Sequence, residues 1–347
     1  MRRVWIGAAV AAAFVVAGCS PSTGGEQAME TGTDEVVVVS YDSMDFPEET
    51  IAKFEEETGY KLTISQLGSG GELVNQLVLS KDQPLGDVAF GVDNISVYRA
   101  VSEGVFADEA PEVPAWAAQQ QIEGTSLIPF DQGDVCVNVD HKWFTDNNLE
   151  EPVTLDDLAD PKYKDLLVAL NPASSSPGMA FFTATIGAYG EDWPTYWEKL
   201  RDNGVKVTKG WSDAFGVDYS AGEGEGPRPM MVSYASSPAW SANEELTESR
   251  TGALLDTCFH QVEYMGVLNG AKNVEGAKAF IEFMLDVPQQ ELISEANYMH
   301  PINPEAKAPE ALVKFGQMSD NPHQVDAKTI AENQQEWLRA WSDLMGQ

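Results

Sequence analysis

Histidine and cysteine are scarce in this chain of 347 residues, which has 4 histidines and 3 cysteines. No histidine stands at metal-ligand spacing from another histidine or from a cysteine, so the sequence predicts no metal site. Phosphate-binding loops, dinucleotide-binding loops and nucleophile elbows are absent as well. The glycine-rich stretch GSGGEL at 68–73 has the wrong spacing for such a loop and predicts a helix entry. We therefore expect neither a cofactor nor an enzyme of a standard class.

Basic residues are also few, because 21 Lys and Arg stand against 55 Asp and Glu, a formal net charge of −34. A surface this acidic repels nucleic acid and anionic lipid and attracts cations. Nucleic acid is therefore excluded as a partner, and a cationic ligand is allowed. The charge does not identify that ligand, because adaptation to a salty medium produces the same composition.

Long apolar runs are missing except near the start, where residues 4–18 fall short of the roughly 20 residues that span a membrane. Arg2 and Arg3 precede this run and Val16-Ala17-Gly18-Cys19 ends it, which is the layout of a signal peptide. The ending resembles a bacterial lipobox. We therefore expect residues 1–18 to be removed and Cys19 to carry a lipid that holds the protein at the cell membrane, with 19–34 as a flexible tether of roughly 20 Å reach. A plain signal peptide or a short membrane anchor is the alternative.

The two remaining cysteines, Cys136 and Cys258, form an even pair in what would be an oxidising compartment. This count favours a disulfide between them. Two separate buried thiols are the alternative.

Predicted strands and helices alternate beyond residue 34. The run EVVVVS at 35–40 is rich in β-branched residues and bounded by polar turns, which predicts a buried strand. Further strands are predicted at 61–67, 87–90, 166–170, 205–208 and 230–234, and helices at 47–58, 70–81, 95–103, 176–189, 193–203, 274–285, 288–295 and 326–345. Strand–helix repetition at this spacing builds parallel sheets covered on both faces, so the fold class is α/β.

The alternation is interrupted at 126–140, where two short apolar runs follow each other without a helix between them. A second strand-like segment lies at 258–268. We interpret these segments as two crossings between two α/β lobes. Lobe 1 then comprises residues 35–132 and 261–347, and lobe 2 comprises residues 133–260.

Turns of aromatic and small polar residues follow most of the predicted strands. They are SYDS at 40–43, GVDN at 91–94, NPASSSPG at 171–178, KGWSDAFG at 209–216 and SYASSPAW at 233–240, with NYMHP at 297–301 in the C-terminal part. Open α/β sheets bind ligands at such positions. Aromatic side chains there would stack on a flat ring at about 0.5–1.5 kcal/mol per pair, and Asp42 or Asp93 would balance a positive charge. The pair Ser176-Pro177 is typical of an N-cap followed by Pro at the first helical position, whose free N–H groups suit an anionic group.

In order and spacing these turns resemble the thiamine-binding proteins of bacterial ABC importers, from about residue 35 to residue 345. The most specific match is TKGWSDAFG followed about 18 residues later by SYASSP. The resemblance implies a type II periplasmic-binding-protein fold, in which two α/β lobes joined by a two-segment hinge close around the ligand.

The resemblance also implies roles for single residues. Tyr41, Trp211 and Tyr234 would face the rings of the ligand. Asp93 would serve its cationic or amine portion, and Ser175 would bind the hydroxyethyl end or a phosphate. The complete expected ligand set is Tyr41, Asp42, Asp93, Ser174, Ser175, Trp211, Phe215, Tyr234, Ser236, Trp240 and Tyr298. Tyr298 stands where the family often has tryptophan, and Trp240 where tyrosine is frequent, which bears on affinity more than on ligand class.

The resemblance therefore implies an extracytoplasmic, lipid-anchored and monomeric receptor that captures thiamine or its phosphate esters and delivers it to an ABC permease. One alternative is a binding protein for another small cation, such as a polyamine or ferric iron. The other is a thiamine-degrading transferase of the same fold, with Cys136 as nucleophile and Glu263 as base. A disulfide at Cys136 would exclude the transferase, because a nucleophile must be a free thiolate.

Overall fold

The computed structural model describes residues 33–347. The predicted signal peptide at 1–18, the lipidated Cys19 and all but the end of the predicted tether lie outside the described residues. Within 33–347, no helix combines the length and the apolar character needed to cross a membrane.

One mixed sheet of nine strands organises the described chain, with the order β2-β1-β3-β8-β4-β7-β5-β6 and with β9 paired to β4. The strands are β1 (Glu35–Ser40), β2 (Lys61–Gln66), β3 (Val88–Asp93), β4 (Ile128–Asp140), β5 (Leu167–Leu170), β6 (Lys206–Thr208), β7 (Met230–Tyr234), β8 (Thr251–Val267) and β9 (His300–Pro301). The pairs β1–β2, β1–β3, β5–β6 and β5–β7 are parallel, as the alternation predicts. The pairs that join these two parallel groups through β4 and β8 are antiparallel.

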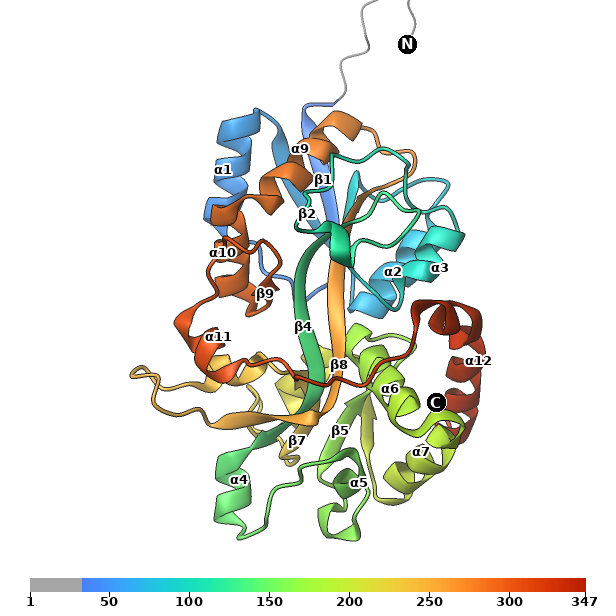
Figure 1. Cartoon of the computed structure of the whole chain (residues 1–347), viewed down its shortest axis with the longest axis vertical. Coiled ribbons are helices and arrows are strands. Elements are labelled where there is room, and N and C mark those ends of the chain that lie inside the picture. Colours follow the sequence, from blue (N-terminus) through green and yellow to red (C-terminus); the bar gives the residue numbers. More distant parts are fainter. Residues whose placement is uncertain (1–32) are drawn as a thin grey trace, which may run out of the picture. The chain divides into compact units, whose positions relative to one another are not determined.

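The long strands β4 and β8 run side by side and connect the two parallel groups (Figure 1). The two short runs predicted at 126–140 are in fact one strand of 13 residues, and the return segment is a strand of 17 residues. The end of β8 pairs with β3 on one side and with the start of β4 on the other, whereas the end of β4 pairs with β7. Their pairing register shifts between Pro129 and Asp131 and again between Val135 and Val137, which bends both strands.

A disulfide joins Cys136 of β4 to Cys258 of β8, next to the second of these register shifts. Both cysteines are fully buried. The predicted lobe boundaries at 132/133 and 260/261 fall inside the same two strands, so the bend and the disulfide lie at the place where the sequence puts the hinge.

Helices cover the sheet, and most of them lie where the apolar periodicity predicts them. They are α1 (Glu48–Thr58), α2 (Gly70–Leu79), α3 (Val97–Ser102), α4 (His141–Asp146), α5 (Leu155–Leu158), α6 (Ser176–Tyr189), α7 (Trp193–Asp202), α8 (Trp211–Asp213), α9 (Val274–Leu285), α10 (Val287–Asn297), α11 (Glu310–Phe315) and α12 (Ala327–Met345). α6 is buried almost all round, which is why its residues are nearly all apolar or small.

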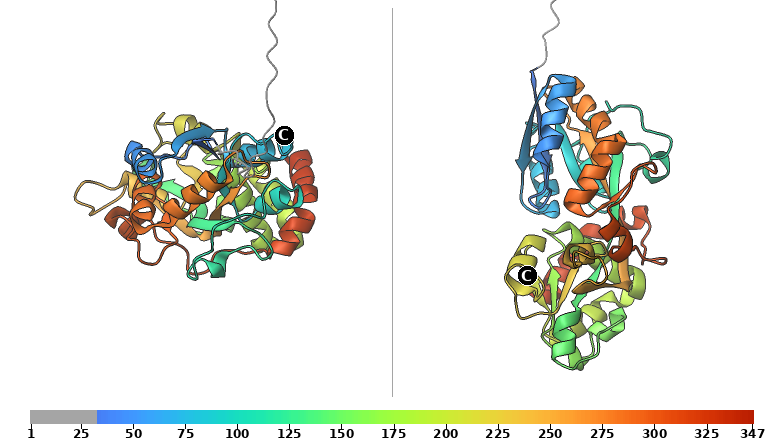
Figure 2. Two further views of the ribbon diagram at one scale, coloured as in Figure 1. Left: turned by 90° about the horizontal axis from the view of Figure 1, so that it is seen from above. Right: turned by 90° about the vertical axis from the view of Figure 1, so that its left-hand side faces the viewer.

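Buried side chains form separate cores for the two parallel groups. In the first core, Phe54 of α1 packs edge-on against Phe280 of α9 with ring centroids 5.6 Å apart, and Figure 2 shows these two helices side by side. In the second core, Phe182 of α6 meets Trp193 and Trp197 of α7 at 4.9 and 6.0 Å. Each parallel group thus has the apolar interior of a separate α/β lobe.

The C-terminal helix α12 packs against a different lobe from the one that the sequence predicts. The sequence assigned all of 261–347 to lobe 1, but Trp341 of α12 is buried against Trp197 at 5.4 Å and against Phe182. Ile330 of α12 belongs to the same core. The amphipathic helix at 326–345 was correctly predicted, but its apolar face completes the core of lobe 2, so the chain crosses between the lobes a third time before α12.

Candidate functional site

A cavity of about 470 Å³ lies between the two lobes, a size typical of small-molecule sites. Lobe 1 contributes Tyr41, Ser43 and Asp45 after β1 and residues 296–299 at the end of α10. Lobe 2 contributes Asn138, Trp211, Phe215, Tyr219, Ala221, Glu223, Ser233, Tyr234, Ser236, Ser237, Trp240, Ser241, Arg250 and Thr251. A narrow extension, lined by Asp42, Ser175, Ser176 and Glu263 among others, shares Tyr41, Trp211 and Tyr234 with this cavity.

Tyr41 follows the last residue of β1, and its position depends on Gly91 in β3. The backbone of Gly91 has a φ of +92°, and a Cβ atom there would lie 2.4 Å from Cε1 of Tyr41. Glycine is therefore needed twice, for the left-handed backbone and for the space that the tyrosine ring occupies. The Tyr41 hydroxyl donates to Oε2 of Glu263 at 3.0 Å.

Trp211 and Phe215 form one aromatic wall of the cavity. Their rings are stacked, with centroids 4.7 Å apart and an angle of 11° between the planes. Trp211 Nε1 donates to Oγ of Ser233 at 2.8 Å, which fixes the indole against β7. The short helix α8 continues into a π-helical turn at Ala214–Asp218 that brings Phe215 beneath Trp211, and such turns are frequent at functional sites.

Trp240 and Tyr298 both line the cavity and meet from opposite lobes, with ring centroids 4.7 Å apart. Trp240 is 63% exposed. Tyr298 ends α10 with a φ of 53°, a backbone conformation that non-glycine residues adopt at a cost and that clusters at binding sites.

Two buried carboxyl groups lie near Tyr41 and form what we call the acidic floor: Glu263 lines the extension of the cavity, whereas Asp131 lines neither the cavity nor its extension. Glu263 accepts hydrogen bonds from Tyr41 and, at 3.0 Å, from Nε2 of Gln261, while Asp131 lies directly opposite it in the β4–β8 pairing. Neither Asp131 oxygen has a partner among residues 33–347. Burial raises the pKa of Asp131 and of Glu263 well above the ordinary values, and for Glu263 the charge of Asp131 adds to this rise. A cation above this floor would stabilise the ionised carboxylate.

Most of the predicted ligand residues come together at this site. The cavity is lined by Tyr41, Trp211, Phe215, Tyr234, Ser236, Trp240 and Tyr298, and its extension by Asp42 and Ser175. That these residues contact a ligand stays a prediction.

Asp93 and Ser174 line neither cavity, so the structure does not bring them together with the other predicted ligand residues, and their roles stay predictions. Asp93 Oδ1 accepts from the backbone N–H groups of Ile95 and Ser96 at 2.8 and 2.7 Å, and Oδ2 accepts from the Ser176 hydroxyl. The Ser174 hydroxyl donates to the carbonyl of Lys209 at 2.6 Å. The Asp93 side chain thus holds a turn and reaches across to lobe 2, and that of Ser174 ties two turns of lobe 2 together. Strand-end position alone does not fix the direction of a side chain.

The N-cap of α6 is also shifted from its predicted place. Ser175, not Ser176, is the cap residue, and its Oγ accepts from the backbone N–H of Gly178 at 3.2 Å. Ser176 instead reaches Asp93 of lobe 1. Across the same interface, Lys209 of lobe 2 pairs with Glu72 of lobe 1 at 2.8 Å.

Sequence reasoning missed several polar residues of the cavity and its extension, of which Asn138 and Glu263 lie in the two long strands. Glu263 was considered only as a catalytic base, and Asn138, Tyr219 and Arg250 were not considered. Polar residues in otherwise apolar strand segments, such as Asn138 in DVCVNV and Gln261 with Glu263 in HQVE, were the available signal.

The arrangement is suited to holding a flat cationic molecule. It offers aromatic faces on several sides, a buried carboxylate beneath, and hydroxyl groups along the β7 turn. Cys136 is bonded to Cys258 and so presents no thiolate. Among residues 33–347, no group of three or more His, Cys, Asp or Glu side chains is placed to hold a metal ion.

Comparison with known proteins adds a family. A family model described as bacterial extracellular solute-binding protein matches residues 49–323. The thiamine-binding periplasmic protein of Escherichia coli (strain K12) is 27% identical over 312 residues, 88% of this chain and 92% of that protein. A solved periplasmic thiamin binding protein is 25% identical with a TM-score of 0.77, covering 90% of this chain and 96% of its own. The ferric binding protein from Campylobacter jejuni, 18% identical with a TM-score of 0.69 over 89% of this chain and 99% of its own, shares the fold.

Proposed function

Because the chain belongs to the bacterial extracellular solute-binding protein family, we propose that it captures thiamine outside the cytoplasm and delivers it to an ABC permease. The observation that carries the proposal is the combination of aromatic walls in the cavity between the lobes with a buried carboxylate in its narrow extension. Thiamine consists of two flat rings, one of them cationic, and needs both features.

The energies of these features suffice for a capture protein. Stacking contributes about 0.5–1.5 kcal/mol per aromatic pair, and a desolvated cation over an aromatic face about 2 kcal/mol. Hydrogen bonds and the charge of Glu263 add to these terms. Together with lobe closure they can exceed the roughly 8 kcal/mol that corresponds to a micromolar dissociation constant.

Glu263 takes the charge-balancing role that the turn pattern suggested for Asp42 or Asp93. It is 1% exposed and lies in the narrow extension of the cavity, next to Tyr41 and Ser175. The cationic thiazolium ring would then lie above Tyr41, with its hydroxyethyl group directed toward Ser175. Thiamine phosphate esters would place their phosphate at the same end, near the N-terminus of α6.

The proposal also includes export of the protein and its attachment to the membrane. The basic start, the apolar run and the cysteine at position 19 support removal of residues 1–18 and lipidation of Cys19. The mature protein would act as a monomer at the outer surface of the cell membrane and bind the membrane subunits of the permease. It would perform no chemistry on thiamine, since the only nucleophile considered, Cys136, is in a disulfide.

Calorimetric titration of residues 20–347 with thiamine, thiamine monophosphate and spermidine tests the function. We expect one-to-one binding of thiamine at sub-micromolar concentration and none of spermidine, which lacks flat rings. Binding of spermidine alone would favour a polyamine receptor. An absence of heat with both thiamine compounds would contradict the proposal.

A further inference from the structure

A compact loop at residues 219–228, which we call the glycine loop, lies between the π-helical turn and β7 in the sequence. Its two ends are joined, because the backbone N–H of Ser220 donates to the carbonyl of Arg228 at 2.9 Å. Inside the loop, the carbonyl of Tyr219 accepts from the backbone N–H of Gly222 at 3.1 Å. Compact loops whose ends lie close together are frequently functional.

Three alternating glycines place this loop directly on the backbone of the π-helical turn. A Cβ atom at Gly222 would overlap the carbonyl oxygen of Phe215, and one at Gly224 would overlap that of Gly216. Gly226 has the same relation to the last residue of the turn. None of the three glycines has a positive φ, so glycine is required here for space and not for backbone conformation. Because the obstructing atoms belong to the backbone, no side chain can move aside to admit a methyl group.

The residues between these glycines face away from the turn. Glu223 and Glu225 are exposed, and Glu223 lines the cavity together with Ala221. The glycine loop therefore belongs to the cavity wall on one side and covers the π-helical turn on the other.

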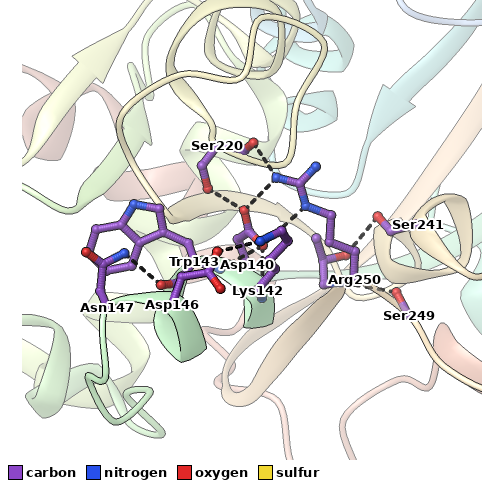
Figure 3. A network of polar contacts seen from close by, with 10 residues as sticks. Asp140, Lys142, Trp143, Asp146, Asn147, Ser220, Ser241, Ser249 and Arg250 are labelled. Atoms are coloured by element: carbon purple, nitrogen blue, oxygen red, sulfur yellow. Dashed lines mark hydrogen bonds and ion pairs between the residues drawn. The ribbon is translucent and has the colours of Figure 1, made fainter.

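A network around the buried Asp140 fixes the start of the glycine loop to the two long strands, as Figure 3 shows. The Ser220 hydroxyl donates to Asp140, the last residue of β4, at 2.7 Å. Arg250, which precedes β8, donates to both Asp140 oxygens at 3.3 and 2.9 Å and to the carbonyl of Ser220 at 2.7 Å. Hydrogen bonds between ionised groups are about twice as strong as neutral ones. The loop is thus held by the strands as well as by the turn that it covers.

The π-helical turn carries Phe215, and Phe215 supports Trp211 in the aromatic wall of the cavity. The two rings are stacked with centroids 4.7 Å apart. A π-helical turn is a rare conformation that the local sequence does not secure by itself. Since Gly222 lies against the carbonyl of Phe215, any outward shift of the loop or of the turn moves the ring that supports Trp211.

We propose that the glycine loop is a positioning element of the binding site. By covering the π-helical turn it holds Phe215 against Trp211, and so it sets the aromatic wall on which a flat cation stacks. Gly222 and Gly224 are then positioning residues, which act on the ligand only through Phe215 and Trp211. The inference rests on the proposed function for the identity of that ligand, thiamine.

Fluorine NMR of the mature chain labelled with 5-fluorotryptophan tests the position of Trp211 without any ligand. The Trp211 resonance is assigned by its loss in Trp211→Phe. We expect Gly222→Ala and Gly224→Ala to shift this resonance in the same direction as Phe215→Ala does, because each change separates the stacked rings. Gly216→Ala is the matched control. Gly216 lies in the same turn, but no atom lies within 4 Å of the place that its Cβ would take, so the resonance should not move.

Calorimetric titration with thiamine measures the effect on binding. Gly222→Ala and Gly224→Ala should each weaken thiamine binding at least about fivefold, because the displaced wall loses stacking, whereas Gly216→Ala should change it less than about twofold. In a protein that already carries Phe215→Ala, the further change Gly222→Ala should cost less than about twofold, because the ring that it positions is gone.

A full further loss in the Phe215→Ala protein would show that the glycine loop affects binding by another route, and would overturn the proposal. An unmoved Trp211 resonance in both glycine variants would do the same, as would unchanged thiamine affinity in both. If Gly222→Ala does not fold, Gly224→Ala, at an exposed position, decides the outcome. If the unmodified protein binds no thiamine, the proposed function fails, while the fluorine resonance still shows whether the loop positions Trp211.

Discussion

At the scale of single residues, the position of Tyr41 depends on the absence of a side chain at Gly91. We predict that Gly91→Ala weakens thiamine binding about tenfold, because the new Cβ, 2.4 Å from the ring, displaces Tyr41 from Glu263. Calorimetry measures the change. Gly59→Ala is the control, since Gly59 also has a positive φ, +77°, but no atom lies within 4 Å of the place that its Cβ would take. If both variants bind thiamine equally well, Tyr41 does not contribute to the site.

Trp211 is the aromatic residue with the firmest support, through Phe215 on one side and Ser233 at its nitrogen. We predict that Trp211→Ala weakens thiamine binding by at least about tenfold, through loss of stacking and of contact with the cation. Fluorescence or calorimetric titration checks this. Trp143→Ala is the matched control, because Trp143 lies in α4 away from the cavity lining. Unchanged affinity in Trp211→Ala would remove Trp211 from the site.

The raised pKa of Glu263 predicts a pH dependence of binding. The free protein retains a proton on Glu263 above the ordinary carboxyl range, whereas a cation requires the ionised carboxylate, so thiamine affinity should rise as the pH increases above that range. The free energy of unfolding of the free protein changes with pH in the opposite direction. Because the folded-state pKa of Glu263 is raised, the contribution of Glu263 to this free energy is complete below its unfolded-state pKa and is lost as the pH rises through its folded-state pKa.

Titrations of the unmodified protein and of Glu263→Gln at several pH values check this prediction. Glutamine keeps the size of the side chain and removes its titration, so the variant should bind more weakly and with little pH dependence. A similar rise of affinity with pH in both proteins would assign the effect to another group.

At the scale of elements, the disulfide between Cys136 of β4 and Cys258 of β8 closes a loop across 122 positions of sequence. Chain-entropy arguments give about 4–5 kcal/mol for a loop of this length. We predict that Cys136→Ser with Cys258→Ser lowers the free energy of unfolding by about this amount in urea titrations. Counting thiols in the unreduced protein should find neither Cys136 nor Cys258 free, and a free thiol at either would contradict the bond.

At the scale of the whole molecule, the features that depend on local pattern could be predicted from the sequence. The strands and helices on either side of the hinge, and the aromatic turns that carry Trp211 and Tyr234, are encoded by short-range periodicity and by turn chemistry. Asn138 and Glu263 could not be placed in this way. Their direction depends on the register shifts between β4 and β8, which are set by contacts far apart in the sequence. The sequence likewise could not show which lobe α12 packs against, because an apolar helix face does not specify which core it completes.

The segment at 316–326 gives the hinge a third connection. It passes along β4 and β8 on its way to α12 (Figure 1), where the backbone N–H of Ser319 donates to Asp134 at 2.6 Å and that of His323 donates to the carbonyl of Cys258 at 2.8 Å. Two bodies joined by one flexible link can rotate about several axes, whereas three neighbouring links favour rotation about one. We therefore expect any opening of the lobes to be a rotation about one axis, like that of a door, and each closure to return Trp240 and Tyr298 to the same alignment.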